Sequence, residues 1–225
     1  MRVSVGVGMF AVALLGLYTF DAVPFKIIYV LFSVVAAVEL MSFFRRGATA
    51  LRVVLAVAEV ACLVLGAIFV MRIDVAHFWY IILGVPGYDI FAYLTGKMLG
   101  GRIIRKSRPF PRISQNKTWE GTVLGLLMAT WMVAGLMAAR GAFATEWVYL
   151  FCGPLALIGD LFESFLKRRF GIKDSNELVI RNKFFSHLEM LVGGSEGHGG
   201  FLDRVDSAAF TMSVLLIISW LSQGL

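Results

Sequence analysis

Charged residues are scarce in this sequence, and so are cysteine and proline. Only 16% of its 225 residues are Asp, Glu, Lys or Arg, against about 25% in an ordinary soluble domain, so the charges are too few to cover a globular surface in water. Two cysteines and five prolines exclude a disulfide scaffold and a collagen-like or proline-rich disordered chain. The sequence instead has 59% hydrophobic residues and a mean hydropathy of +0.80. This composition predicts an all-α integral membrane protein.

The hydrophobic residues are gathered into windows long enough to cross a bilayer, which takes roughly 20 mostly apolar residues in a helix. About seven such windows predict a polytopic protein whose residues 1–225 form a single membrane domain. The first window is expected to be retained, because no small-residue cleavage site follows it. The windows are 3–20, 27–44, 53–71, 77–96, 120–139, 147–166 and 207–223.

Lysine and arginine are distributed unevenly over the loops between these windows. Of the 21 basic residues, 18 fall in alternate loops, and cytoplasmic loops are the ones that keep Lys and Arg. The amino terminus is therefore predicted inside and the carboxyl terminus outside, with long cytoplasmic loops at 97–119 and 167–206. The net charge of +6 fits this rule and an anionic ligand, and it gives no support to nucleic-acid binding.

Apart from Glu120 at the first residue of the fifth span, five carboxylates fall inside the predicted spans, where an ionisable group costs at least ~2.5 kcal/mol at the bilayer centre. Glu39 and Glu59, in the second and third spans, also have a structural interpretation, in which each forms an ion pair with Arg45, Arg46 or Arg52. Asp89 has no basic neighbour in sequence before Lys97, which favours a functional role. The five are Glu39, Glu59, Asp89, Asp160 and Glu163.

The sixth span carries a polar strip that ends at the cytoplasmic surface. Asp160, Glu163, Ser164 and Lys167 are spaced i, i+3, i+4 and i+7, so they share one helix face. Carboxylates, a hydroxyl and an ammonium group on one strip indicate a site for a metal and a phosphate. The alternative is an internal ion-pair strip that only locks two helices together.

A glycine-rich turn precedes the last span. Residues 197–200 read Gly-His-Gly-Gly and free the backbone to bring several N–H groups close to an anion, at the start of a helix. Asp203 and Asp206, at i and i+3, can hold a hard divalent cation such as Mg²⁺, and Arg204 lies beside them as a fixed cation for phosphate.

A third polar motif, residues 114–121, reads Ser-Gln-Asn-Lys-Thr-Trp-Glu-Gly just before the fifth span. Its hydroxyls, amide, ammonium and carboxylate suit a nucleotide. It is equally consistent with a helix-capping turn, in which Ser114 or Thr118 is the N-cap and Trp119 an interfacial anchor.

Together these motifs resemble those of the CTP-dependent phosphatidate cytidylyltransferases, the CDP-diacylglycerol synthases. The resemblance covers about residues 85–210 and places a catalytic region in residues 76–225, after N-terminal helices in residues 1–75. The matching elements are Ser164-Phe165-Leu166-Lys167-Arg168, Lys173-Asp174, His198 through Asp206, Ser114 through Gly121, and Asp89 in its Gly-Tyr-Asp context.

The resemblance implies Mg²⁺-dependent transfer of CMP from CTP to phosphatidic acid, giving CDP-diacylglycerol and pyrophosphate, with a second metal ion left open. It implies a homodimer among the lipids of the bacterial inner membrane, with its active site on the cytoplasmic side. The expected catalytic residues are Asp160, Lys167, Asp203 and Asp206, and the expected metal ligands are the three aspartates. The expected nucleotide-binding residues are Ser114, Asn116, Lys117, Thr118, Glu120, Lys173, Asp174, His198, Gly199, Gly200 and Arg204. Further candidates are Asp89, Glu163 and Ser164.

The sequence departs from the family pattern between Asp174 and His198, where typical members have a shorter connection. The extra segment, 179–196, suggests an amphipathic helix on the cytoplasmic leaflet. Because this change borders the route of the acceptor, two alternatives stay open: a cytidylyltransferase for another lipid phosphate, or a CTP-dependent polyprenol kinase. A transporter with buried carboxylates is the alternative of another class, although the sequence has no internal repeat.

Overall fold

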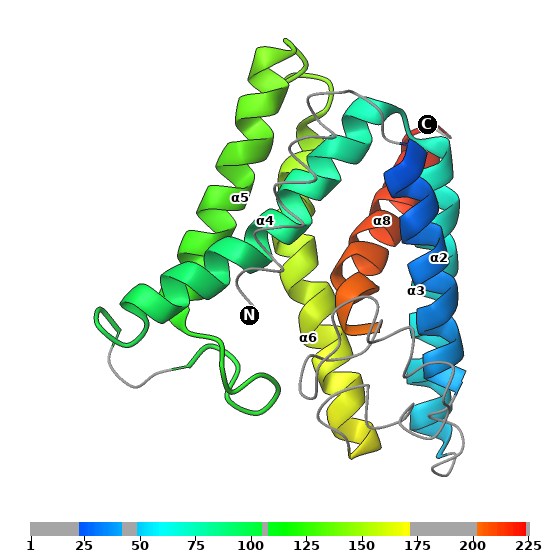
Figure 1. The fold of residues 1–225 in the computed structure, drawn as a ribbon, viewed down its shortest axis with the longest axis vertical. Coiled ribbons are helices and arrows are strands. Elements are labelled where there is room, and N and C mark those ends of the chain that lie inside the picture. The colour runs from blue at the N-terminus through cyan, green and yellow to red at the C-terminus, as the bar shows by residue number, and fades with distance from the viewer. Residues whose placement is uncertain (1–22, 42–48, 105–107, 172–201, 224–225) are drawn as a thin grey trace. The chain divides into compact units, whose positions relative to one another are not determined.

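Helices make up the secondary structure of the computed structural model, which describes residues 23–41, 49–104, 108–171 and 202–223 (Figure 1). Within these ranges there is no β-strand, so the predicted all-α class is confirmed for this part of the chain. The elements are α2 (Val23–Met41), α3 (Ala50–Arg72), α4 (Val75–Leu99), α5 (Trp119–Ala139), the short 3₁₀ helix η2 (Trp147–Phe151), α6 (Cys152–Phe170) and α8 (Leu202–Gln223).

Four helical stretches are long and apolar enough to cross a membrane, and they coincide with four of the predicted windows. They are Ala50–Arg72, Val75–Leu99, Trp119–Ala139 and Trp147–Phe170. Shorter apolar stretches lie in α2 and α8, whereas the window at 3–20 falls outside the described residues. Large apolar side chains on the outer sides of these helices are exposed, as expected where lipid covers them. The chain is therefore an integral membrane protein.

The described helices belong to two compact units, and the boundary between the units falls within α6. Unit 1 contains α4, α5, η2 and the beginning of α6 up to Ile158. Unit 2 contains α2, α3, α8 and the part of α6 that starts at Gly159. The sixth span thus contributes its acidic and basic strip, which begins at Asp160, to unit 2.

In unit 1, α4 and α5 pack with their backbones almost in contact. A Cβ atom added at Gly125 would lie 2.7 Å from the Cβ of Ala92, and one added at Gly121 would lie 2.6 Å from the Ala92 carbonyl oxygen. Small residues allow this close approach, which is a common way for membrane helices to associate. The interface therefore fixes the start of α5, where the motif of residues 114–121 ends.

Gly125→Val is expected to lower the yield and thermal stability of the folded protein, because the added side chain would overlap α4. Overpacking of this kind costs roughly 1–3 kcal/mol. Gly135→Val is a matched control in the same helix, since nothing lies within 4 Å of a Cβ added there. Size-exclusion chromatography of detergent-extracted variants after heating checks this. Equal losses for both variants would contradict the close contact.

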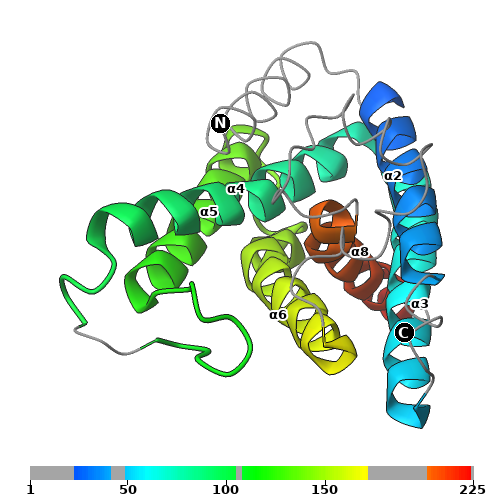
Figure 2. The same ribbon diagram turned by 60° about the horizontal axis from the view of Figure 1, so that its bottom comes forward.

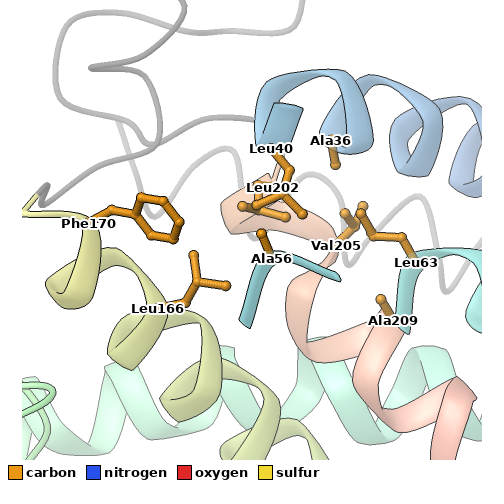
Figure 3. Packing of buried hydrophobic residues seen from close by; sticks show 9 residues of the cluster. All are labelled: Ala36, Leu40, Ala56, Leu63, Leu166, Phe170, Leu202, Val205 and Ala209. Carbon is orange, nitrogen blue, oxygen red and sulfur yellow. The ribbon is translucent and has the colours of Figure 1, made fainter. Parts of the chain in front are cut away.

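In unit 2, α2, α3 and α8 lie side by side in both views (Figures 1 and 2). They enclose an apolar core together with the second half of α6, and Figure 3 shows its side chains converging from all four helices. The close approach of α6 and α8 depends on Gly159, where an added Cβ would lie 2.9 Å from the Cα of Ser207. The core residues are Ala36, Leu40, Ala56, Leu63, Leu166, Phe170, Leu202, Val205 and Ala209.

Candidate functional site

Three carboxylates from two helices meet beside the core of unit 2. Asp160 and Glu163 come from α6 and Asp206 from α8, and one oxygen of each lies within 4.8 Å of the others. Glu163 and Asp206 are only 1% and 6% exposed. The i, i+3 spacing places the two α6 carboxylates on one face, and the contact at Gly159 brings α8 close enough to add the third.

The ammonium group of Lys167 completes this acidic cluster on the same face of α6. Its Nζ lies 2.6 Å from Oε2 of Glu163, one turn earlier, and both side chains are shielded from solvent. Asp160, Glu163 and Lys167 of the predicted strip therefore lie close together in the structure. Ser164, the fourth member of the strip, is half-buried.

The donor set fits a hard divalent cation. Mg²⁺ prefers carboxylate oxygens and keeps further positions for water or phosphate oxygens. Three carboxylates held this close in a buried place repel one another unless positive charge is supplied. Asp160 and Asp206 were both expected as metal ligands. Glu163 was expected only as a further candidate, and its place in the cluster depends on how α6 and α8 pack.

In unit 1, the lysine of the 114–121 motif lies against α4. Nζ of Lys117 donates a hydrogen bond of 3.3 Å to the hydroxyl of Tyr88 and lies 5.2 Å from the centre of its ring. Tyr88 is fully buried, whereas the next residue, Asp89, is exposed on α4. This arrangement fixes one cation of the predicted nucleotide-binding motif at the surface of a membrane helix.

Thr118 caps α5, as one of the two interpretations of its motif predicted. Its Oγ1 accepts a hydrogen bond of 3.1 Å from the backbone N–H of Gly121, and Thr118 is the N-cap residue. A threonine N-cap typically contributes about 1 kcal/mol to helix stability. Nucleotide binding by Thr118 stays a prediction beside this structural role.

Glu120 holds the turn that follows α4. Its Oε1 accepts hydrogen bonds of 3.0, 3.1 and 2.9 Å from the backbone N–H groups of Gly101, Ile103 and Ile104. The side chain is 5% exposed, and its Oε2 is buried with no hydrogen-bond partner among the described residues. Glu120 therefore ties the turn at residues 101–104 to the start of α5.

Glu120→Ala is expected to release this turn. The backbone amides of Gly101, Ile103 and Ile104 should then exchange with solvent at least about tenfold faster, because each loses its acceptor. Hydrogen–deuterium exchange of the purified protein measures this.

Asp74→Ala is the matched control. Its carboxylate accepts a single backbone hydrogen bond, 2.9 Å from the N–H of His77, at the start of α4. This variant should leave exchange in residues 101–104 unchanged. Unchanged exchange at those residues in Glu120→Ala would show that Glu120 does not hold the turn.

An open hollow of about 450 Å³ lies beside the same motif and is lined by Arg108, Pro111, Gln115 and Asn116. A guanidinium nitrogen of Arg108 donates to the carbonyl of Gln115, which places a fixed cation next to the amide of Asn116. Sequence reasoning did not single out Arg108. It is one of seven basic residues in the segment 97–119, and nothing in the sequence distinguishes it from the other six.

The remaining predicted site residues lie at the start of α8 or outside the described ranges. Asp203 and Arg204 lie in the first turn of α8, but their side chains are outside the described part. Five further residues lie outside the described ranges, so their predicted roles stay predictions. They are Lys173, Asp174, His198, Gly199 and Gly200.

Comparison with known proteins gives a family match over the middle of the chain. The model of the cytidylyltransferase family matches residues 71–180. The chain is similar to phosphatidate cytidylyltransferases of three bacteria. It is 37% identical to that of Brucella abortus over 132 residues, which cover 57% of this chain and 41% of the relative. It is 34% identical to the enzyme of Helicobacter pylori over 139 residues, which cover 60% of this chain and 44% of the relative. It is 35% identical to that of Rickettsia bellii over 144 residues, which cover 59% of this chain and 53% of the relative. The chain thus matches about half the length of these relatives.

Proposed function

Because residues 71–180 of the chain belong to the cytidylyltransferase family, we propose that the protein transfers CMP from CTP to phosphatidic acid. The products are CDP-diacylglycerol and pyrophosphate. The observation that carries this proposal is the buried cluster of Asp160, Glu163 and Asp206 with Lys167 beside it. Such a cluster suits two polyanionic reactants that must be brought together.

The chemistry needs charge neutralisation more than it needs a base. The attacking oxygen of phosphatidic acid already belongs to an anion, and it displaces pyrophosphate from the α-phosphorus of CTP in line. Asp160, Glu163 and Asp206, with Asp203 as a further ligand, would hold a Mg²⁺ ion, which would supply positive charge to the phosphate oxygens. Lys167 adds a fixed ammonium group that counters the charge developing in the transition state.

The nucleotide is expected at the motif of residues 114–121. Lys117 is fixed by Tyr88, and Asn116 lines the hollow next to Arg108. An amide and two cations are suitable donors for a cytosine base and phosphates. Glu120 keeps this loop attached to α5. The residues expected to add phosphate contacts are Lys173, Asp174, His198, Gly199, Gly200 and Arg204.

The membrane arrangement proposed here follows from the positive-inside distribution of charge. Seven spans place the amino terminus inside and the carboxyl terminus outside, with the active site on the cytoplasmic side of the bacterial inner membrane. The acyl chains of phosphatidic acid then stay in the bilayer while its phosphate reaches the carboxylates. A homodimer and a second metal ion are further parts of this proposal.

Incubation of the purified full chain with labelled CTP, Mg²⁺ and a panel of lipid phosphates and polyprenols tests the reaction. The expected result is a labelled CDP-lipid with phosphatidic acid and release of pyrophosphate. A CDP-lipid formed only with another lipid phosphate would change the acceptor. Release of CDP with a phosphorylated polyprenol would overturn the proposed transfer, and so would absence of any CTP turnover.

A further inference from the structure

Glu59 lies on the buried face of α3, in a part of the chain that precedes the family match. It is 2% exposed and follows Ala56 and precedes Leu63 on the same helix face, spaced i, i+3 and i+7. A carboxylate among apolar core residues of a membrane-spanning helix is costly, so its retention calls for a specific partner. Nothing in the nucleotidyl-transfer proposal above uses Glu59.

The face of α3 that carries Glu59 packs against the elements of the acidic cluster. Ala56 and Leu63 belong to the same core as Leu166 of α6 and Val205 of α8 (Figure 3). The residues that follow these two in sequence are Lys167 and Asp206, both members of the candidate site. The packing of the core therefore brings the Glu59 face of α3 to the site from a third helix.

Electrostatic contacts agree with this placement. The Lys167 ammonium group lies within electrostatic range of the Glu59 carboxylate. The buried hydroxyl of Tyr29 lies within electrostatic range of both the Glu59 and the Asp206 carboxylates.

Of the three arginines expected as partners of Glu59, the structure describes only Arg52, which has contacts with α6. Arg52 donates a hydrogen bond of 3.1 Å from Nε to the carbonyl of Arg169 and lies 5.5 Å from the centre of the Phe170 ring. Arg45 and Arg46 lie outside the described residues.

We propose that Glu59 is a positioning residue for Lys167. Lys167 is paired directly with Glu163 on its own helix and also lies in the field of the buried Glu59 carboxylate on α3. Negative charges on two different helices restrict the direction of a flexible lysine side chain, whereas Glu163 alone would draw the ammonium group onto itself. This inference rests on the proposed function, because the positioned ammonium group is the one that counters phosphate charge.

Glu59→Gln keeps the size of the side chain and removes its charge. We expect kcat for CDP-lipid formation to fall about 10- to 100-fold, since small displacements of a reacting group have effects of this size. The KM for CTP should stay within about twofold, because Glu59 does not touch the nucleotide. Glu59→Asp should restore part of kcat. A purely structural role would lower the amount of active protein without this separation of kcat from KM.

Ser213→Ala is the matched control for packing. Oγ of Ser213 donates a hydrogen bond of 2.8 Å to the carbonyl of Cys62, so this variant also alters the contact between α3 and α8. It should leave kcat per folded molecule unchanged. A kcat for Glu59→Gln within about twofold of the wild-type value would overturn the inference.

A second readout does not depend on turnover. Thermal unfolding of Glu59→Gln, Lys167→Gln and the double variant measures the coupling between the two side chains. The double variant should lose less in melting temperature than the two single losses added together. If wild-type protein turns over no CTP, the proposed function fails and this coupling alone decides the pairing. Additive losses would overturn the inference.

Discussion

Asp206→Asn is expected to reduce Mg²⁺-dependent formation of CDP-lipid by roughly 100- to 1000-fold, the size of effect seen when a group that stabilises transition-state charge is lost. The substitution keeps the shape of the side chain and removes one of three carboxylates whose oxygens lie within 4.8 Å of one another. The loss should arise from weaker metal binding. The Mg²⁺ concentration needed for half-maximal rate should therefore rise, and direct binding of Mn²⁺, followed by electron paramagnetic resonance, should weaken in parallel.

Thr211→Ala is the control for this substitution. Its hydroxyl donates a hydrogen bond of 2.7 Å to the carbonyl of Ser207, so it lies on the same helix without taking part in the cluster. Thr211→Ala should keep both Mn²⁺ binding and turnover. Normal Mn²⁺ affinity in Asp206→Asn would contradict the assignment of Asp206 as a metal ligand.

Lys167→Gln is expected to lose activity to a similar extent and, in addition, to destabilise the protein. The lysine is paired at 2.6 Å with a carboxylate that is 1% exposed, and removing one partner of a buried pair typically costs about 3–5 kcal/mol. Turnover and thermal unfolding should both be measured, because the two effects have different origins. Loss of turnover reflects the missing phosphate cation, and loss of stability reflects the uncompensated Glu163.

The double variant Lys167→Gln/Glu163→Gln separates these two effects. It removes both charges of the pair, so much of the lost stability should return while turnover stays low. Recovery of turnover together with stability would show that the lysine has only a structural role. Normal turnover in the single variant would contradict its catalytic assignment directly.

The sequence was sufficient to predict those features that depend on local spacing. Long apolar windows predicted α3, α4 and α5, because a helix that crosses a bilayer needs a minimum number of apolar residues. The i, i+3 and i+7 spacing likewise placed Asp160, Glu163 and Lys167 on one face of α6, since helix geometry alone determines that face.

Contacts between segments that are distant in the sequence could not be predicted from local spacing. Glu120 was expected to bind nucleotide, but its hydrogen bonds to the turn at residues 101–104 arise only when α4 and α5 pack together. Glu59 was expected to pair with nearby arginines. Pairing with Arg45 or Arg46 stays a prediction, because both lie outside the described residues. The electrostatic influence of Lys167 on Glu59 joins positions 108 residues apart and depends on the rotation of α3 about its own axis. Neither contact leaves a periodic signal in the sequence.

The close contact between α4 and α5 affects how substitution tolerance along the motif of residues 114–121 should be interpreted. Gly121 immediately follows Glu120, yet any side chain at Gly121 would meet the Ala92 carbonyl at 2.6 Å. A saturation-mutagenesis screen that selects for growth would therefore find Gly121 and Gly125 as intolerant as Lys117. For the glycines, that intolerance would report the distance between two backbones rather than contact with a substrate. Variants should accordingly be sorted by the amount of folded protein before any position in this motif is assigned to chemistry.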